Sequence, residues 1–364
     1  MKRLLSLILC LGLLCSLAAC QGSTPAQSAQ SSSAPAEVST RTDVADVSQD
    51  PADVSTLLQE GLDGSISAPA PVEEPEVVTT RAARTYGLSM GAHPSATDKA
   101  TAKALKKFAK AMGDKLVIAE GAETAEEQQE RLNELVEQRV DAIFLCPADA
   151  AALEGTVTSL SQQGAVVLGF GGWDYLPEGM VSVVRSDDYN AGYVCGMDLA
   201  EHCPDGGDVL VLERTEDAAL MERCTGFMEA AEESGVDLQV LDELELEGGS
   251  KAVAKTVQQA LADAPQVVGI FAPRDKDAAA ALSAVAGTGI WVYGGEGSPE
   301  LKSQLGTAAN LAGVGAQSPL AVAKTLLQSA NDHLDAESVE EEQTVGSFLI
   351  TAKNVKTYGT DGWQ

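Results

Sequence analysis

The sequence has few basic residues and few aromatic residues. Lysine and arginine together number 24 against 54 aspartates and glutamates, which gives a formal net charge of −30 at pH 7. Contact with nucleic-acid phosphates needs clustered lysine and arginine, so this balance argues strongly against a nucleic-acid-binding protein. It argues equally against docking on anionic lipid through a basic patch. Only 4% of residues are aromatic, and the 34 glycines with other small residues are typical of an α/β protein.

Motifs for metal binding and covalent catalysis are also missing. The three histidines, His93, His202 and His333, are scattered, and no C-x-x-C or C-x-x-H spacing indicates a metal site. No Ser-His-Asp or Cys-His arrangement is suggested. The glycine-rich stretch 169–172 lacks the lysine and hydroxyl of a phosphate-binding loop. The sequence therefore predicts a protein that is not an enzyme and that has no cofactor or metal.

The cysteines do not form a disulfide framework. Four of them follow position 20, at Cys146, Cys195, Cys203 and Cys224. Cys195 and Cys203 are eight residues apart on one predicted helix, about 12 Å along its axis, which is too far for a direct bridge. A Cys203–Cys224 bridge stays open, but buried free thiols are favoured.

The first twenty residues have the pattern of an export signal. Lys2 and Arg3 precede an apolar run, residues 4–14, that is too short to span a bilayer comfortably. The segment 17–20, LAAC, then resembles a bacterial lipobox, whose cysteine becomes the lipid-carrying N-terminus. We expect residues 1–20 to be a lipoprotein signal peptide and Cys20 to be the lipidation (palmitate) site. The mature protein would then be held at the extracytoplasmic face of the cell membrane by its lipid anchor only. An ordinary secretory signal is the alternative.

Residues 21–84 differ in composition from the rest of the chain. Serine, alanine, proline, threonine, valine and aspartate dominate, and too little apolar surface is present to offset chain entropy. We interpret this segment as a disordered tether with a reach of roughly 40–45 Å.

From residue 85 onward, short apolar runs alternate with helical patterns, which is typical of a parallel sheet wrapped by helices. Strands are expected at 116–119, 141–146, 166–168, 209–212, 238–241, 267–271 and 290–293, and helices at 100–112, 126–138, 150–163, 191–202, 220–233, 250–263 and 277–286. Two successive sets of such units predict an α/β fold of two doubly wound, Rossmann-like lobes. In such sheets, ligands bind beyond the carboxyl ends of the strands. The acidic run 337–342 is interpreted as a solvated helix face.

Several motifs occur in order along this part of the chain. They are Gln128 followed by RVDAI at 139–143, CPAD at 146–149, RSDDYNAG at 185–192, RCTGF at 223–227, FAPRD at 271–275, GGEGSPE at 294–300, AQSP at 316–319 and FLITAKNV at 348–355. Each is weak alone. Together, and behind a lipobox, they resemble the type I periplasmic binding proteins of the ribose-type branch, which capture sugars for ABC importers.

The resemblance implies two lobes with a cleft between them, joined by a hinge of three crossovers. We place these crossovers near Asp187, Gln317 and Gly346. Residues 85–187 and 318–345 would then form the N-terminal lobe, and residues 188–317 and 346–364 the C-terminal lobe.

The resemblance also implies which residues hold the ligand. Arg223 and Gln317 keep the residue types that the family uses. Glu296 replaces an aspartate, which conserves the charge and extends its reach by one methylene. Arg274 replaces an asparagine and brings a fixed positive group.

Other positions depart from the family pattern. Gly171 and Gly172 stand where sugar binders often carry Asp-Arg, and the adjacent Trp173 and Asp174 are candidate substitutes. The first loop has His93 and Asp98 where ring-stacking aromatics are expected. The full set of expected ligand-binding residues is Arg223, Arg274, Glu296, Gln317, His93, Asp98, Trp173 and Asp149.

Two interpretations of Arg274 compete. In one, Arg274 beside Arg223 creates a pocket for an acidic group such as that of a sugar acid, because arginine binds planar carboxylates bidentately. In the other, Arg274 pairs with Glu296 or Asp275, and the ligand is a neutral sugar or polyol. The charge of −30 would slow the encounter with an anion, which favours the neutral ligand.

The predicted function is a lipid-anchored extracellular solute-binding protein of an ABC transporter. It would capture a small polar solute, a sugar or sugar derivative, in the cleft between the lobes and present it to ABC permease subunits. The alternative is a ligand-binding sensor subunit of a chemotaxis or kinase signalling system. An extracellular enzyme lacks a nucleophile–base motif in this sequence, and a cytoplasmic repressor lacks a helix-turn-helix segment ahead of the lobes.

Overall fold

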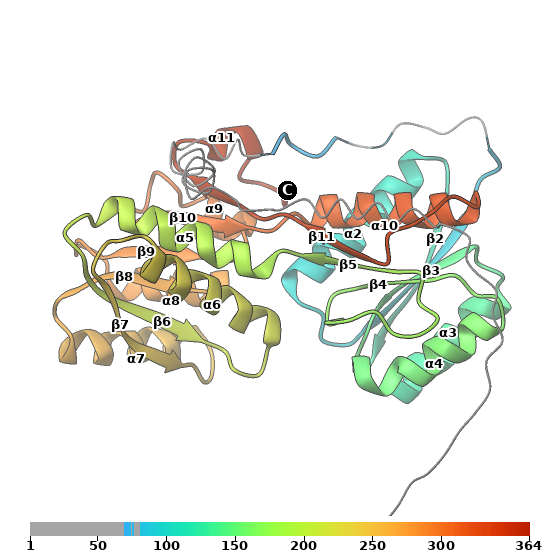
Figure 1. The fold of residues 1–364 in the computed structure, drawn as a ribbon, viewed down its shortest axis with the longest axis horizontal. Coiled ribbons are helices and arrows are strands. Elements are labelled where there is room, and N and C mark those ends of the chain that lie inside the picture. Colours follow the sequence, from blue (N-terminus) through green and yellow to red (C-terminus); the bar gives the residue numbers. More distant parts are fainter. Residues whose placement is uncertain (1–68, 74, 76–80) are drawn as a thin grey trace, which may run out of the picture. The chain divides into compact units, whose positions relative to one another are not determined.

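The computed structural model describes residues 69–73, 75 and 81–364 (Figure 1). The predicted signal peptide, its lipobox cysteine Cys20 and most of the predicted tether lie outside the described residues. The described chain forms two six-stranded sheets, each covered by helices on both faces. The predicted fold class, an α/β protein of two doubly wound lobes, is confirmed.

The first sheet has the strand order β11-β5-β4-β3-β1-β2, and all its pairs are parallel. Its strands are β1 (Thr85–Gly91), β2 (Lys115–Ala122), β3 (Ala142–Cys146), β4 (Val167–Phe170), β5 (Ser182–Ser186) and β11 (Glu342–Val345). Figure 1 shows α2 (Ala96–Ala111) and α10 (Pro319–Leu334) over one face, and α3 (Ala125–Glu137) and α4 (Ala150–Gln162) over the other. Because the pairs are parallel, the carboxyl ends of these strands meet at one edge.

The second sheet has the order β12-β10-β9-β8-β6-β7, with β12 antiparallel to β10. Its strands are β6 (Gly207–Glu213), β7 (Leu238–Glu245), β8 (Val267–Ala272), β9 (Trp291–Gly294), β10 (Leu311–Ala316) and β12 (Phe348–Thr351). Helices α5 (Asp188–His202) and α6 (Ala218–Glu233) share one apolar core with this sheet. The apolar core on the opposite face of this sheet is formed by four helices: α7 (Ser250–Asp263), α8 (Asp275–Ala284) and the short α9 (Pro299–Lys302) and α11 (Val355–Tyr358).

Most helices begin at a side chain that caps their own backbone. The capping side chains are Ser95, Thr124, Asp149, Asp187, Asp217, Ser298 and Ser318, each accepting from an N–H in the first turn. These caps satisfy backbone donors that have no partner inside the helix. Because each helix follows a parallel strand, the caps place polar residues at the carboxyl edges of both sheets.

The chain passes from one sheet to the other three times: between β5 and α5, between β10 and α10, and between β11 and β12. The first and third passages are hydrogen-bonded to each other. The backbone N–H of Asp187 donates to the carbonyl of Val345 at 2.9 Å, and the amide of Asn190 donates to the carbonyl of Ser347 at 2.8 Å. The hydroxyl of Ser347 donates to the carbonyl of Asp187.

The boundary predicted at residue 84 needs a correction. Arg81 and Arg84 belong to the predicted disordered tether, yet both are fixed to the first lobe. The Arg81 guanidinium makes two hydrogen bonds to Asp114, at 2.9 and 2.7 Å, and the Arg84 backbone N–H donates to the same carboxylate at 2.8 Å. The composition of the segment gave no sign of these contacts, because the acceptor, Asp114, lies 33 residues after Arg81 and 30 residues after Arg84.

Two smaller expectations are also resolved. The acidic run 337–342 is not a helix face: residues 337–341 form a connection, and β11 begins at Glu342. It joins α10 to an edge strand, and its carboxylates lie in solvent. Among the described residues, Cys146, Cys195 and Cys203 are in the thiol form, which excludes the Cys203–Cys224 bridge.

A buried ion pair ties the loops of the second lobe to α8. The Arg214 guanidinium contacts both oxygens of Asp277 at 3.0 Å and also donates to the carbonyls of Leu246 and Gly248, at 2.9 and 3.2 Å. Both side chains are more than nine-tenths buried. Such a pair is costly to break from one side, because the remaining charge stays buried without a counter-ion.

We therefore expect Asp277→Ala to lower the free energy of unfolding by about 3–5 kcal/mol in urea titration. Asp263→Ala, at the exposed end of α7, is the control and should change it by less than about 0.5 kcal/mol. A loss for Asp277→Ala no larger than that of the control would contradict the structural role of the pair.

Candidate functional site

A cleft of about 1090 Å³ is lined by residues from the loops at the carboxyl edges of both sheets. Seven of the eight expected ligand-binding residues line it: His93, Asp98, Trp173, Arg223, Arg274, Glu296 and Gln317. The first three come from the lobe of the first sheet. In the second lobe, Arg223 lies in α6, and Arg274, Glu296 and Gln317 follow β8, β9 and β10. Residues far apart in the sequence thus converge on one cavity.

The floor of the cleft is organised by Asp188, the first residue of α5. Its Oδ1 accepts a hydrogen bond from Arg223 Nε at 2.8 Å and another from the amide of Gln317. Arg223 also donates from Nη1 to the carbonyl of Pro273 at 2.8 Å. Burial raises the pKa of Asp188 above its usual range, and the Arg223 guanidinium opposes this shift. The network fixes Arg223 and Gln317, which are only 4% and 2% exposed, in one orientation.

Glu296 and Asp275 form a second fixed group beside this floor. The Asp275 backbone N–H donates to Glu296 Oε2 at 2.9 Å, and the Glu296 backbone N–H donates to Asp275 Oδ1 at 3.0 Å. The other Asp275 oxygen accepts from the backbone of Ser298 at 2.6 Å. Burial, with Asp275 nearby, raises the pKa of Glu296 to about 7. Both carboxylate oxygens of Asp275 therefore accept backbone hydrogen bonds, whereas Glu296 has one oxygen, Oε1, left to face the cleft.

Arg274 directly precedes Asp275 in the sequence, but its side chain is bonded neither to the Asp188 network nor to the Asp275–Glu296 pair. It is the residue before α8 and lines the cleft, half-buried. Among the residues that the structure describes, its side chain makes no hydrogen bond and no ion pair within 4 Å. It acts on Glu296 only at longer range, where its charge opposes the rise in the pKa of that carboxyl.

Asp98 fills space that Gly171 leaves open. A Cβ atom on Gly171 would lie 2.3 Å from Asp98 Oδ1, and this glycine has a φ of +56°. The other oxygen, Oδ2, accepts from the backbone and hydroxyl of Ser95, at 3.0 and 2.7 Å. Burial raises the pKa of Asp98, and the bonds from Ser95 oppose that rise. The family often carries an aspartate at positions 171–172. Here the carboxylate of Asp98, from α2, lies beside that turn instead.

Three of the expected residues have other roles. Asp149 is exposed and does not line the cleft; it caps α4 by accepting from the N–H of Ala152 at 3.0 Å. Trp173 touches the cleft but is 1% exposed, packs in a core cluster and donates its indole N–H to the carbonyl of Leu145 at 3.2 Å. His93 is at the rim, 87% exposed, with Nε2 3.2 Å from Glu123.

Sequence reasoning missed several cleft residues. Asp188 lies inside one of the quoted motifs, but only the fold shows that it joins two of the expected ligand residues. Charged side chains at the rim also went unrecognised: Lys99, Glu216, Asp217, Glu222 and Lys276. Asp174, expected as a candidate beside Trp173, lines the cleft as well. Their signal was position alone, since most of them follow a strand end or begin a helix.

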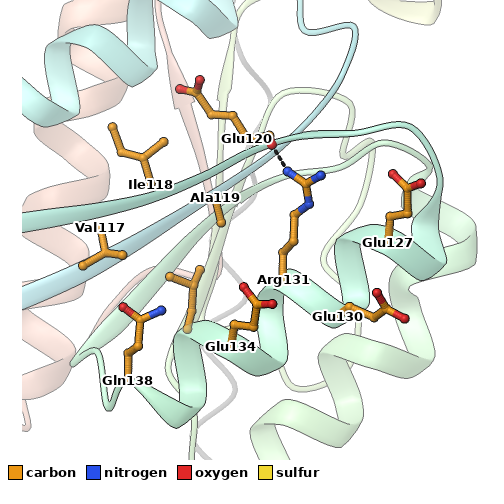
Figure 2. A pocket seen from close by; sticks show the side chains of 10 residues that line it. Val117, Ile118, Ala119, Glu120, Glu127, Glu130, Arg131, Glu134 and Gln138 are labelled. Atoms are coloured by element: carbon orange, nitrogen blue, oxygen red, sulfur yellow. Dashed lines mark hydrogen bonds between the residues drawn. The ribbon is translucent and has the colours of Figure 1, made fainter.

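A second hollow, of about 630 Å³, lies between the edge strand β2 and α3 (Figure 2). Figure 2 shows its lining of glutamates from α3, with Arg131 donating to the backbone carbonyl of Glu120. These glutamates are exposed, and none of the expected ligand residues lies there. In the described part of the chain, no group of three or more histidine, cysteine or acidic side chains is placed to hold a metal ion. The cleft between the two sheets is therefore the candidate site.

Three comparisons with known proteins, by family, by sequence and by structure, all find binding proteins. Residues 86–338 match the family described as periplasmic binding protein domain. A ribose import binding protein of Bacillus subtilis is 26% identical over 273 residues, which cover 74% of this chain and 88% of that protein. Among solved structures, an arabinose binding protein from Geobacillus stearothermophilus superposes with a TM-score of 0.66 at 18% identity, covering 76% of this chain and all of that one. A solute binding protein of Actinobacillus succinogenes with bound D-allose gives 0.67 at 19% identity, with the same coverage.

The Glu296 carboxyl predicts a pH-dependent stability. Its pKa is about 7 in the folded protein and near 4.5 in an unfolded chain, so the folded state binds more protons between pH 5 and 7. The free energy of unfolding therefore falls as the pH rises through this window. Glu296→Gln removes this ionisation, and its stability relative to wild type should increase by up to about 3 kcal/mol between pH 5 and pH 8. Urea titrations at the two pH values measure the difference; parallel behaviour of both proteins would contradict the assignment.

Proposed function

The chain belongs to the periplasmic binding protein domain family, and from this premise we propose that it is the solute-binding protein of an ABC transporter. Its ligand is a small polar solute, a sugar or sugar derivative, held in the cleft. The observation that carries this proposal is the convergence of Arg223, Glu296 and Gln317, each at least 93% buried, on one cavity lined by both lobes.

These three side chains present donors and acceptors that suit a polyhydroxylated molecule. Arg223 uses Nε and Nη1 in the protein, which leaves Nη2 for a ligand. Gln317 uses its amide nitrogen on Asp188, which leaves its carbonyl oxygen as an acceptor. Glu296 adds one carboxyl oxygen. Hydroxyl groups both donate and accept, so they can satisfy this mixed set, and a mismatched ligand would leave buried polar groups unpaired.

The three chain passages support a mechanism of hinge closure. They are the covalent links between the lobes, and the cleft lies beside them, so rotation about them changes the access to the ligand. A ligand that contacts both lobes binds the closed form more tightly than the open form, and it therefore shifts the population toward the closed form. Presentation of that closed form to ABC permease subunits leaves the solute chemically unchanged.

Two of the relatives support a sugar as the ligand class. One is named as a ribose import binding protein, and the other was solved with D-allose. The cleft departs from a ring-stacking site, because Phe170 and Trp173 are each 1% exposed and Tyr189 donates its hydroxyl to Glu229 on α6 at 2.7 Å. Polar contacts therefore supply most of the recognition.

We infer the cellular location from the leader sequence. Within the described ranges, no helix is long and apolar enough to cross a membrane. A diacylated Cys20 would hold the protein at the extracytoplasmic face, and the following 60 residues would give the lobes room to meet a permease.

The ligand is identified by a thermal-shift screen of the purified mature protein with neutral sugars, sugar acids and polyols. Binding raises the unfolding midpoint by mass action, so at least one compound of this panel should do so. With that compound, Gln317→Ala and Glu296→Ala should each raise the calorimetric Kd at least about tenfold, because a buried partner is lost. Asp149→Asn, which keeps the cap of α4 outside the cleft, is the control. No response to the whole panel, or unchanged affinity in both variants, would overturn the proposal.

Lipidation is tested on the full chain in a bacterial host. The wild type should incorporate labelled palmitate and sediment with membranes, and Cys20→Ser should do neither, because the acyl chains are attached at that residue. Cys15→Ser, directly after the apolar run of the leader, should keep the label. Equal labelling of the Cys20→Ser and wild-type proteins would refute the assignment of the lipobox.

A further inference from the structure

Arg274 is set apart from the other arginines of the cleft by its lack of a carboxylate. Arg223 is paired with Asp188 at 2.8 Å, and Arg185 with Glu342 at 2.6 Å. The Arg274 side chain has no such partner among the described residues. It is also half-buried, so part of its hydration is already lost.

The acids expected to pair with Arg274, Asp275 and Glu296, are directed elsewhere in the structure. Asp275 accepts hydrogen bonds on both oxygens from the backbone of Glu296 and Ser298, at 3.0 and 2.6 Å. Glu296 is directed to the backbone of Asp275 at 2.9 Å. The pairing that would make Arg274 a structural residue is therefore not formed, and its guanidinium is left to the cleft.

Arg223 adds further donors to the same wall of the cleft, although Asp188 offsets its charge. Its Nη1 donates to the carbonyl of Pro273, the residue directly before Arg274, so the two guanidinium groups belong to neighbouring parts of one surface. The Nη2 of Arg223 has no hydrogen bond to the described residues. Two guanidinium groups with donors to spare favour a group with several negative acceptors over a single hydroxyl.

We propose that the cleft is specific for a sugar acid, whose carboxylate pairs with Arg274. This rests on the proposed function and names its substrate class. A bound ligand displaces water from Arg274, and a guanidinium without water needs a counter-ion more than it needs neutral acceptors. A carboxylate supplies two parallel acceptors in the plane of the guanidinium, while the hydroxyl groups bind Glu296, Gln317 and the free oxygen of Asp98.

The acidic character of the chain does not oppose this pairing. The net charge of −30 acts on the rate of encounter, and salt screens it over about 8–10 Å. Asp188 is paired with Arg223, Asp275 accepts backbone hydrogen bonds on both oxygens, and Asp187 and Asp217 cap helices. The exposed carboxylates of the rim, such as Glu216 and Glu222, remain hydrated.

The test uses matched pairs of ligands in titration calorimetry on the purified mature protein. D-Glucuronate is compared with D-glucose, D-galacturonate with D-galactose, and D-gluconate with D-glucitol. We expect at least one acid to bind about tenfold or more tightly than its neutral partner. In Arg274→Gln, this ratio of affinities should fall about tenfold, because the bidentate partner of the carboxylate is removed.

Lys255→Gln is the matched control, because it removes one positive charge from the same lobe on an exposed turn of α7, outside the cleft. It should leave the ratio unchanged. Neutral partners that bind as tightly as their acids, or an acid preference that survives in Arg274→Gln, would overturn the inference and leave the solute-binding function standing. Failure of every sugar, acid and polyol to bind would overturn both.

Discussion

The geometry of the cleft depends on one largely buried carboxylate, Asp188, whose side chain is 14% exposed. It stands at the start of α5, directly after the first passage between the lobes, and it holds Arg223 of α6 and Gln317 of the second passage. A buried charge is stable only when it is paired and hydrogen-bonded, and here both needs are met by residues that also face the ligand. The helix dipole of α5 adds a favourable field at this N-terminus. The same interaction therefore stabilises the junction of the lobes and orients the ligand-binding groups.

This arrangement requires α5 and α6 to lie unusually close. A Cβ atom at Gly192 would be 1.8 Å from the carbonyl oxygen of Arg223, and one at Gly226 would be 2.0 Å from that of Tyr189. Only glycine permits such contact between two helix backbones. With any larger residue, α6 would move outward and carry Arg223 away from Asp188. The two glycines are thus as much a part of the cleft as the charged residues that line it.

Most of the fold and about half of the residues that line the cleft could be predicted from the sequence. Short apolar runs separated by helical patterns located most strands, because buried parallel strands are continuously apolar. The exposed edge strand β11, with the sequence EQTV, had no such signal, and the acidic residues before it suggested a helix instead. Arg223, Gln317 and Glu296 could be found because their motifs resemble those of the family; Glu296 and Gln317 also follow strands at the edge where ligands bind, whereas Arg223 lies inside α6. Asp149 and Trp173 occupy similar sequence positions, and only packing separates them: one side chain turns back to cap its helix, and the other enters the core.

The two lobes contribute to the cleft in physically different ways. The second lobe supplies groups whose orientation is fixed before any ligand arrives, since Arg223, Glu296 and Gln317 are buried and bonded to the protein on one side. The first lobe supplies Asp98, half-buried on the first turn of α2, and the exposed His93 at the rim. Preorganised groups lose little entropy on binding, whereas exposed ones must still be ordered. The cost of ordering therefore falls on the half-buried Arg274 and the exposed His93. Asp98, held by Ser95, and the three buried side chains of the second lobe meet the ligand in orientations that the protein has already set.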